Sequence, residues 1–571
     1  MNQVVATDAR VAQLEAALAA ERAALAAERE RTAQLERERE LLRASHERLR
    51  LELELLKRRL FMAKAERVDT QQLELEFAQK LRALDEVAGT LGMARDDAQN
   101  PGRAGKKKYK PSGRRNLKQL PLEEKRVELD DPLFEKLVSQ GKAERIGFEE
   151  SCKLAWQRGG MRRLVIARVK YRTVGQDGEA EVASALMPKE LFFRCLAAGS
   201  LLAHILVQKF CDGMPLFRLE ERFALDGVPL DRGTMSRWVE DAGATLGTTV
   251  VAAMRQEALA TAFCIATDAT GVLVQPVPRE DGGRQACRRG HYFVQVADKD
   301  AIFFEYTPRE TSAAVGEMFK GFSGYIQADA KSVYDALFRV AEDEPPGAGA
   351  EVRQEVACWV HLRRGFWEAT AAKSAVAREG LARIGRIFEL DSVWKGRPPD
   401  EVKRLRDTHL CPHVDAFFAW ALEEYETVRN ERGLLRSALG YAIRHKDALR
   451  RFLDDGRLLL DNNRSELALR RIATGRKAWL FVGSDDHAQS AGHIFTLIAT
   501  ARLHRLDPEA YLRELLRVLA HWPRERYIEL APRYWRATRA QLDLAELEAE
   551  VGDITVPPQL TPTTEEQPTS R

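Results

Sequence analysis

Apolar residues near the start of the chain recur at alternating spacings of three and four residues, a period typical of coiled coils. One heptad position holds Leu14, Leu35, Leu42, Leu49 and Leu56. The other holds Val11, Leu18, Leu25, Leu53 and Leu60. Polar residues interrupt this seam in several heptads, so a single solvated helix is the alternative. We predict a coiled coil over residues 9–62, through which the chain self-associates.

A basic stretch follows the heptads. Residues 63–118 read as a helical extension and then as a linker whose prolines and glycines prevent a continuous helix. The linker, residues 100–118, contains no acid, and its cations include Lys106, Lys107, Lys108, Arg114 and Arg115. Such a run suits contact with the phosphates of a nucleic acid, and a plain solvated linker fits the composition equally well.

Between residues 186 and 255 the apolar positions follow a helical period. An amphipathic helix at 216–223 reaches a glycine-containing break at 226–229, and a second helix begins near Asp231. Two short helices around a glycine turn are typical of a helix-turn-helix, although ordinary helix pairs share this pattern. Three polar residues are expected on the exposed side of the second helix, where such proteins contact DNA: Arg232, Ser236 and Arg237.

Strand-like segments replace the helices after residue 255. Short apolar runs predict strands at 263–266, 291–297, 302–306 and 356–360, and the second and third of them form a hairpin. A helical stretch near 312–319 lies between these strands. Strands that alternate with helices in this way indicate an α/β sheet.

The remaining boundaries follow from the same patterns. Residues 119–185 mix β-like runs with turns, whereas residues 362–456 are rich in Arg, Glu, Ala and Leu and read as a helical region. We assign an α/β core to 256–361 and 457–483, a helical C-terminal region to 484–550, and a disordered tail to 551–571.

Composition narrows the class of protein. Hydrophobic residues make up 45% of the 571 residues, enough for packed cores, which excludes wholesale disorder. The formal net charge is +3, so overall charge identifies no partner. The 7 cysteines never form a C-x-x-C pair, as expected of reduced thiols. We find no signal peptide and no membrane-spanning run, and therefore expect a cytoplasmic protein without a membrane partner.

Two acids share one local context. Asp268 follows the short apolar run FCIAT, and Asp329 follows GYIQA. Carboxylates at neighbouring strand ends emerge at one edge of a sheet, where α/β proteins place ligand sites. Two or three of them suit a hard cation such as Mg²⁺. The alternative is that each aspartate begins a turn or caps the next helix.

A third acid lies on a polar helical stripe. Asn462, Glu466 and Arg470 recur at every fourth position of a helix that Asp461 or Asn462 caps. A carboxylate between an amide and a guanidinium suits a metal ligand flanked by groups that contact phosphate. An exposed helix with charge pairs is the alternative interpretation.

Several longer blocks resemble transposases of the insertion sequence 66 family. They are ATDAT at 266–270, GYIQADAKSVYDAL at 324–337, CWVHLRRGFWEA at 358–369 and DNNRSELALRRIATGRKAWLFVGSD at 461–485. The last block, together with LIATARLHRLDPEAYL at 497–512, is the most specific. The likeness extends through most of the chain, including LKRRLF at 56–61 and LFRLEERFALDGVPLDRGTMSRWV at 216–239.

The resemblance implies a DDE transposase with an α/β ribonuclease H-like catalytic core. A helical insertion interrupts this core, and a coiled coil and a helical DNA-binding region precede it. The implied catalytic residues are Asp268, Asp329 and Glu466, which bind two Mg²⁺ ions, with Mn²⁺ as a substitute. Such an enzyme cleaves DNA at the ends of its element and joins the freed 3′-hydroxyl to target DNA. Its expected partners are DNA, further copies of the chain and small accessory proteins.

The expected DNA-contacting residues combine local charge with the resemblance. The basic linker and the two-helix region contribute Lys106, Lys107, Lys108, Arg114, Arg115, Arg232 and Arg237. The blocks that resemble the family contribute His361, Arg363, Arg364, Asn462, Arg470, Arg476 and Lys477.

The sequence departs from the family at two places. Members usually carry a cysteine-based zinc module after the basic linker, but residues 119–180 contain only Cys152 and no histidine. We therefore expect a degenerate module at 119–185 and no bound zinc. Leu467 stands where members often have an arginine beside the catalytic glutamate. An inactive copy or a non-catalytic DNA-binding regulator is therefore an alternative, as is a nuclease without strand joining.

Overall fold

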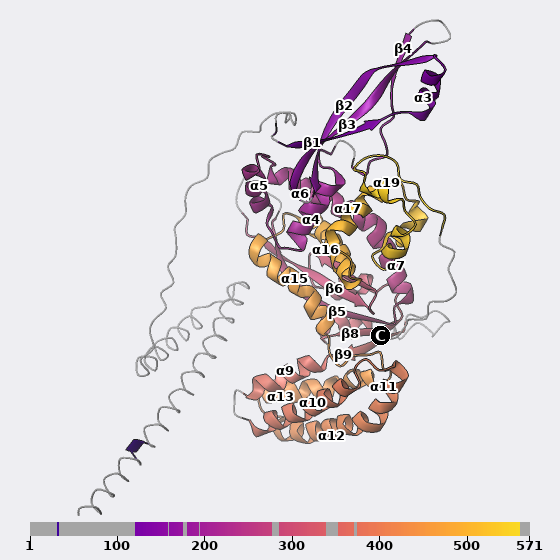
Figure 1. Cartoon of the computed structure of the whole chain (residues 1–571). Coiled ribbons are helices and arrows are strands. Elements are labelled where there is room, and N and C mark those ends of the chain that lie inside the picture. Colours follow the sequence, from indigo (N-terminus) through magenta and orange to yellow (C-terminus); the bar gives the residue numbers. More distant parts are fainter. Residues whose placement is uncertain are drawn as a thin grey trace, which may run out of the picture. The chain divides into compact units, whose positions relative to one another are not determined.

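The chain divides into two units, residues 1–112 and 113–571. The computed structural model describes residues 31–32, 120, 122–157, 159–174, 180–192, 195–276, 285–329, 331–338, 352–370 and 374–559 (Figure 1). The predicted coiled coil, apart from residues 31–32, lies outside the described residues. So does the basic linker with Lys106, Lys107, Lys108, Arg114 and Arg115, and both stay predictions.

A four-stranded sheet opens the second unit. Its strands are β1 (Glu123–Leu129), β2 (Ala143–Gln157), β3 (Gly160–Val174) and β4 (Ala180–Ser184), and the helix α3 (Pro132–Ser139) follows β1. β2 and β3 form a long antiparallel hairpin, while β1 runs parallel to β3. Opposite charges pair across these strands, as in Arg163–Glu124 (2.6 Å) and Arg168–Glu149 (2.6 Å). Cross-strand ion pairs thus neutralise arginines of this sheet.

The helices after this sheet include the predicted two-helix pair. They are α4 (Gly199–Phe210), α5 (Leu216–Leu225), α6 (Arg232–Leu246) and, after a π-helical turn, α7 (Ala252–Thr261). α6 begins where the sequence predicted, because the side chain of Asp231 accepts hydrogen bonds from the backbone N–H groups of Gly233 and Thr234. The pair α5–α6 is therefore confirmed as a structure, and its role in DNA binding stays a prediction.

A five-stranded sheet follows, in the order β7-β6-β5-β8-β9. Its strands are β5 (Cys264–Val274), β6 (Arg288–Ala297), β7 (Ala301–Thr307), β8 (Gly324–Ala328) and β9 (Arg353–Ala357). β6 is antiparallel to both β5 and β7, whereas β8 runs parallel to β5 and to β9. The predicted hairpin is confirmed as β6 and β7, and the predicted helix between strands as α8 (Ser312–Met318).

Two strand boundaries differ from the predictions. β5 does not end before Asp268, because its second half pairs with β6 as far as Val274. Asp268 therefore lies within a strand and not after one. The last strand ends at Ala357 instead of residue 360, because the helix α9 (Trp359–Ala369) begins immediately after it.

The helix α16 (Asp485–Leu503) covers the edge strand β7. The backbone N–H groups of Ile302 and Phe304 donate to the hydroxyl groups of Thr500 (3.1 Å) and Thr496 (3.0 Å) on this helix. Gly492 permits the close approach, because a Cβ atom there would lie 2.5 Å from the carbonyl oxygen of Phe304. Side chains of α16 thus satisfy donors that an edge strand would otherwise expose. Figure 1 shows α15 (Asn463–Trp479) and α16 beside β5 and β6.

The C-terminal helices pack back onto the rest of the unit. They are α17 (Pro508–Val518), which contacts α4, and the short α18 (Trp535–Arg539) and α19 (Leu544–Glu548). The predicted disordered tail is wrong for its first part, residues 551–559. Val551 and Ile554 are buried there, and Arg526 donates a hydrogen bond to the carbonyl oxygen of Pro557 (2.9 Å). Apolar residues among the prolines are the reason that this segment packs.

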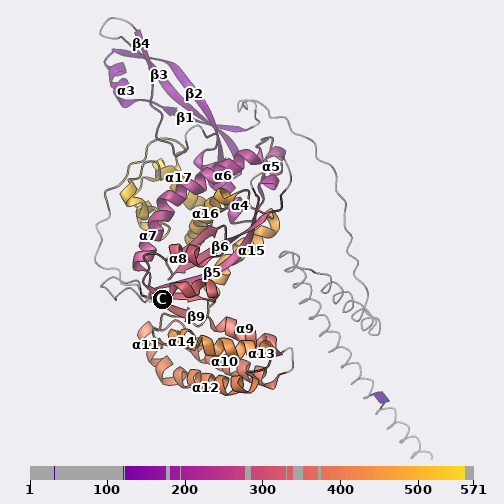
Figure 2. The same ribbon diagram turned by 180° about the vertical axis from the view of Figure 1, so that it is seen from behind.

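A helical bundle with a hydrophobic core of its own separates β9 from α15. Its helices are α9, α10 (Ala375–Val393), α11 (Pro399–Leu405), α12 (Cys411–Val428), α13 (Leu434–Arg444) and α14 (Lys446–Arg450), which Figure 2 shows together beside β9. Trp359 is buried in this core, and its indole N–H donates to the carbonyl oxygen of Leu449 (2.8 Å). No described helix, in the bundle or elsewhere, is long and apolar enough to span a membrane.

A buried arginine stabilises the bundle between α11 and α12. The side chain of Arg406 is 2% exposed and pairs with Asp391 at 2.8 Å. It also donates to the carbonyl oxygens of Phe452 (2.7 Å) and Asp455 (3.1 Å). A buried charge of this kind is costly unless all of its partners are present.

We expect Arg406→Ala to destabilise the bundle by about 3–5 kcal/mol, because it leaves the half-buried Asp391 carboxylate and two backbone carbonyl oxygens without their partner. Limited proteolysis followed by mass spectrometry should detect cleavage within residues 375–450 at a lower temperature than in the wild type. The exposed neighbour provides the control, since Arg404→Ala should leave the cleavage temperature unchanged. Equal protection of Arg406→Ala and the wild type would contradict the assigned role.

Candidate active site

The first two predicted acids lie on neighbouring parallel strands. In the pairing of β5 with β8, Ala266 lies opposite Gln327. Two residues further along, this register brings Asp268 level with Asp329, which directly follows β8. Their side chains are 16% and 7% exposed, respectively. The two carboxylates therefore lie at the same place on the sheet, mostly shielded from water.

A lysine ammonium group lies between these carboxylates. Lys331 Nζ is 2.9 Å from Asp329 Oδ2 and 3.9 Å from Asp268 Oδ1. The other oxygen of Asp329, Oδ1, is buried and has no hydrogen-bond partner among the described residues. Because buried carboxylate oxygens are normally hydrogen-bonded, this atom is an acceptor that the fold leaves unused.

Hydrogen bonds between α15 and β5 bring the third acid toward the same strand. Asn462, at the start of α15, is buried, and its Nδ2 donates to the carbonyl oxygen of Thr267 (2.7 Å). Near the other end of α15, Arg476 donates to the carbonyl oxygen of Gly271. Glu466 follows Asn462 by about one helical turn, and so it lies close to the point where α15 is attached.

A histidine of the helical bundle lies near the third acid. His361, in the first turn of α9, has its Nε2 3.9 Å from Glu466 Oε1. Burial lowers the pKa of His361 below its ordinary value, although the negative charges of Asp329 and Glu466 oppose this shift. The ring is therefore neutral at pH 7. Its Nδ1 is buried and has no hydrogen-bond partner within the described part of the chain.

Burial and mutual repulsion disfavour ionisation at this site. Burial raises the pKa of Asp268 to about 6, and the charges of Asp329 and Glu466 add to the increase. A hydrogen bond from the backbone of Ala269 and the charge of Lys331 oppose it. A carboxyl group whose pKa is raised by burial and by like charges is typical of functional sites.

The donor set at this place fits a hard divalent cation. Carboxylate oxygens are the ligands that Mg²⁺ and Mn²⁺ prefer, and Asp329 Oδ1 is unused. As the side chains stand, however, no three His, Cys, Asp or Glu residues of the described ranges are grouped so that they hold a metal ion. Lys331 supplies the positive charge instead. The carboxylates fit a cation once this ammonium group has moved away.

Of the nine described residues that were predicted to contact DNA, six have exposed side chains. These are Arg232, Arg237, Arg363, Arg364, Arg470 and Lys477. Asn462 and Arg476 donate to backbone carbonyl oxygens of β5, and Ser236 bonds to His487 Nε2 (3.0 Å). For all of these residues, contact with DNA stays a prediction.

The sequence analysis missed Lys331. Its position two residues after Asp329, in the segment ADAK, was a usable signal, because a cation so close to a shielded acid tends to pair with it. The anchoring role of Asn462 had no such signal, since it depends on the packing of α15 against β5. Leu467, noted as a departure from the family, is 60% exposed.

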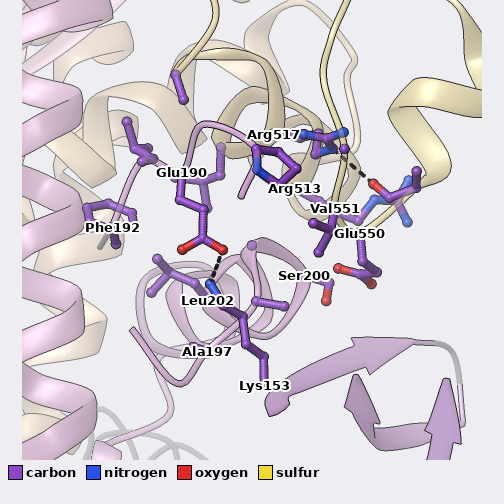
Figure 3. Close-up of a pocket in the computed structure, with 18 of the residues that line it drawn as sticks. Lys153, Glu190, Phe192, Ala197, Ser200, Leu202, Arg513, Arg517, Glu550 and Val551 are labelled. Atoms are coloured by element: carbon purple, nitrogen blue, oxygen red, sulfur yellow. Dashed lines mark hydrogen bonds and ion pairs between the residues drawn. The ribbon is translucent and has the colours of Figure 1, made fainter. Parts of the chain in front are cut away.

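A separate cavity of about 290 Å³ lies away from the three acids, where β2, α4 and α17 meet the segment after α19 (Figure 3). In Figure 3 the Glu190 carboxylate pairs with Lys153, at 2.7 Å. Arg517 donates to the carbonyl oxygen of Ala549 (3.0 Å). Because these charged groups bind one another or the backbone, the cavity is a packed junction between the four-stranded sheet and the C-terminal segment.

Comparison with known proteins identifies the family. The family model "Transposase IS66 family" matches residues 194–490, and the model "IS66 C-terminal element" matches residues 496–533. Two uncharacterized proteins of Sinorhizobium fredii (strain NBRC 101917 / NGR234), y4qI and y4hP, are each 28% identical to this chain, over 397 and 404 residues. These matches span 68% and 67% of this chain and 71% and 70% of the relatives. The chain therefore belongs to the IS66 family of transposases.

Proposed function

We propose that this protein is a DDE-type transposase that cleaves DNA at the ends of an insertion sequence and transfers the freed strand into target DNA. One observation carries the proposal. Asp268 and Asp329 lie level on neighbouring strands around one ammonium group, and Glu466 lies about one helical turn after Asn462, which attaches α15 to β5 beside Asp268. The two aspartates come from separate segments of the chain, and packing for stability alone does not require them to lie together.

The sheet topology supports a ribonuclease H-like core. If the strands of the five-stranded sheet are numbered along the chain, their order across the sheet is 3-2-1-4-5. Only the second strand, β6, is antiparallel to the first strand, β5. Helices α15 and α16 pack on this sheet, and the bundle α9–α14 is inserted before α15. We infer that β5 to β9 with α15 form the catalytic core and that the bundle is an insertion within it.

The proposed chemistry divides between cations and side chains. Two divalent cations, when bound, supply the charge that activates water and stabilises the leaving oxygen of a phosphodiester. Asp268, Asp329 and Glu466 would hold them. Until then, Lys331 compensates part of the negative charge of the two aspartates. His361, neutral at pH 7, lies beside Glu466 without adding charge.

DNA is the proposed partner, and the exposed cations near these acids support it. Arg363 and Arg364 follow His361 on α9, and Arg470 and Lys477 lie on exposed positions of α15. The pair α5–α6 adds Arg232 and Arg237. We further propose that the heptads of residues 9–62 join copies of the chain, so that two element ends are held together.

We expect Asp268→Asn, Asp329→Asn and Glu466→Gln each to reduce Mg²⁺-dependent cleavage of DNA carrying the element ends by at least about a hundredfold, because each removes a cation ligand. Gel analysis with sequencing of the product ends measures both cleavage and strand transfer. Binding of the same DNA should stay within about threefold of the wild type, since no phosphate contact is lost.

The matched control is Asp335→Asn, an exposed carboxylate a few residues after Asp329, which should cleave normally. Cleavage by any of the three variants would remove that residue from the proposed site. A wild-type protein that binds element ends but never cleaves them with Mg²⁺ or Mn²⁺ would favour the non-catalytic regulator. Cleavage without strand joining would indicate a nuclease.

The raised pKa of Asp268 predicts how stability depends on pH without metal. The pKa is about 6 in the folded chain against an ordinary 3.8, so folding favours the protonated form. Stability from this group is therefore complete below pH 3.8 and is lost as the pH rises through about 6. At pH 7.5 the ionised group should cost on the order of 1–3 kcal/mol.

In EDTA at pH 7.5, Asp268→Asn should therefore melt a few degrees above the wild type, and the difference should shrink as the pH is lowered to about 5. Differential scanning calorimetry measures this. Addition of Mn²⁺ should stabilise the wild type and not the variant. A variant that melts below the wild type at pH 7.5 would show that ionised Asp268 is not destabilising.

Lys331→Met should bind Mn²⁺ about three- to tenfold more tightly than the wild type, because the cation no longer competes with the ammonium group for Asp268 and Asp329. Isothermal titration calorimetry measures the affinity without any need for activity. Lys320→Met is the control, since Lys320 is 73% exposed and pairs with Glu317 at 3.8 Å. Unchanged or weaker binding by Lys331→Met would contradict the competition.

A further inference from the structure

Cations gather around a small cavity on the side of α15 that faces neither the sheet nor the three acids. The cavity has a volume of about 180 Å³ and lies between the end of α4 and α15. Lys209, Cys211, Arg471 and Thr474 line it. Arg471 Nη1 lies 3.8 Å from Cys211 Sγ, and Arg502 Nη1 approaches the same sulfur from α16, at 3.1 Å.

Among the described residues, these three cations have no acidic partner, unlike arginines such as Arg526 in the same unit. Among the described residues, no carboxylate lies within 4.0 Å of Lys209, Arg471 or Arg502, and the acceptor for both arginines is a thiol, which is a weak one. The acid that lines the cavity, Asp212, accepts a hydrogen bond from Gln208 (3.1 Å). By contrast, Arg526 on the same unit pairs with a glutamate at 2.8 Å.

The surroundings of Lys209 also favour the binding of an anion. Burial lowers the pKa of Lys209 to about 8, because it destabilises the charged form of this side chain. The aromatic residues Phe210, Trp479 and Phe495 also line the cavity and exclude water from one side. An anion inside the cavity would favour the charged form of Lys209, because opposite charges attract more strongly where water is excluded.

The faces of α15 place this cavity beside the predicted DNA surface. Arg471, Thr474 and Ala478 follow at helical spacing and line the cavity. Arg470 and Lys477 lie on the adjoining exposed face, the one that also carries Glu466. On its other side, the end of α4 leads through Gly213 into α5, the first helix of the pair α5–α6.

We propose that this cavity binds a phosphate group of the DNA backbone through Arg471, Arg502 and Lys209. The inference rests on the proposed function, and it adds a phosphate contact that would fix α15, the helix of Glu466, against bound DNA. Guanidinium groups match phosphate in shape and charge. The volume is below the ~300–1,000 Å³ of pockets for whole organic ligands, so one group of a longer molecule fits better than a free nucleotide.

The experiment compares the full chain with the double variant Arg471→Gln/Arg502→Gln in binding to a fluorescent DNA duplex between about 50 and 200 mM salt. We expect affinity to fall about tenfold and the slope of log K against log salt to decrease by about one, the value for one lost phosphate contact. The charge-preserving variant Arg471→Lys/Arg502→Lys should recover most of the affinity and the slope. Circular dichroism and melting temperature verify that each variant is folded.

The matched control removes the same charge elsewhere. Arg397→Gln/Arg429→Gln alters two exposed arginines that already pair with Glu401 and Glu426, and it should keep the wild-type slope. Equal slopes for the wild type and Arg471→Gln/Arg502→Gln would overturn the proposal, as would an equal loss in the control variant. A wild type that binds no duplex would instead overturn the proposed function.

A second arm identifies the source of the phosphate. Inorganic phosphate at millimolar concentration should raise the melting temperature of the wild type only slightly, because a single group gains little without the attached backbone. Strong stabilisation by inorganic phosphate that the double variant loses, with duplex binding unchanged, would show a site for a free anion and overturn the assignment to DNA.

Discussion

The repulsion between carboxylates that share one poorly hydrated place is the main physical constraint on the proposed catalytic core. Asp268 and Asp329 are largely shielded from water, and their pairing with a single ammonium group is what permits this. The raised pKa of Asp268 shows that this compensation is incomplete. Such a site is more stable with a stronger counter-charge than with the lysine alone, and this is the physical reason to expect that a divalent cation replaces it.

The attachment of α15 to β5 begins directly beside the acids, since Asn462 donates to the carbonyl oxygen of Thr267, the residue before Asp268. Glu466 would be expelled from the neighbourhood of two carboxylates if its own helix were free to move. Asn462 and Arg476 donate to backbone carbonyl oxygens of β5 near the two ends of α15, so the attachment uses no negative charge of the site. The core of the bundle α9–α14 includes Val356 and Ala357 of β9, so the bundle packs directly against this strand.

Much of this arrangement was accessible from the sequence, for identifiable reasons. Strong local periodicity predicted the α5–α6 pair, the β6–β7 hairpin and the helical bundle, because each is decided by residues near one another in the chain. The continuation of β5 past Asp268 was missed, since it depends on pairing with β6. The packing of residues 551–559 was missed for a similar reason, because proline-rich composition conceals Val551 and Ile554. For the site, residue types suggested the three acids. The pairing of Lys331 with the aspartates and the inward orientation of Asn462 became evident only from the packed structure.

The two faces of α15 connect the proposed chemistry with the proposed recognition of DNA. One face carries Glu466, and another carries Arg471 beside the cavity with Lys209. A rigid helix transmits a displacement along its whole length, so a phosphate bound at Arg471 would also fix the position of Glu466. The carboxylate would then be held in place most firmly when DNA is present. In the proposed mechanism, bound cations would supply the counter-charge that Lys331 provides in the metal-free protein, and a phosphate held at Arg471 would keep Glu466 in position beside them.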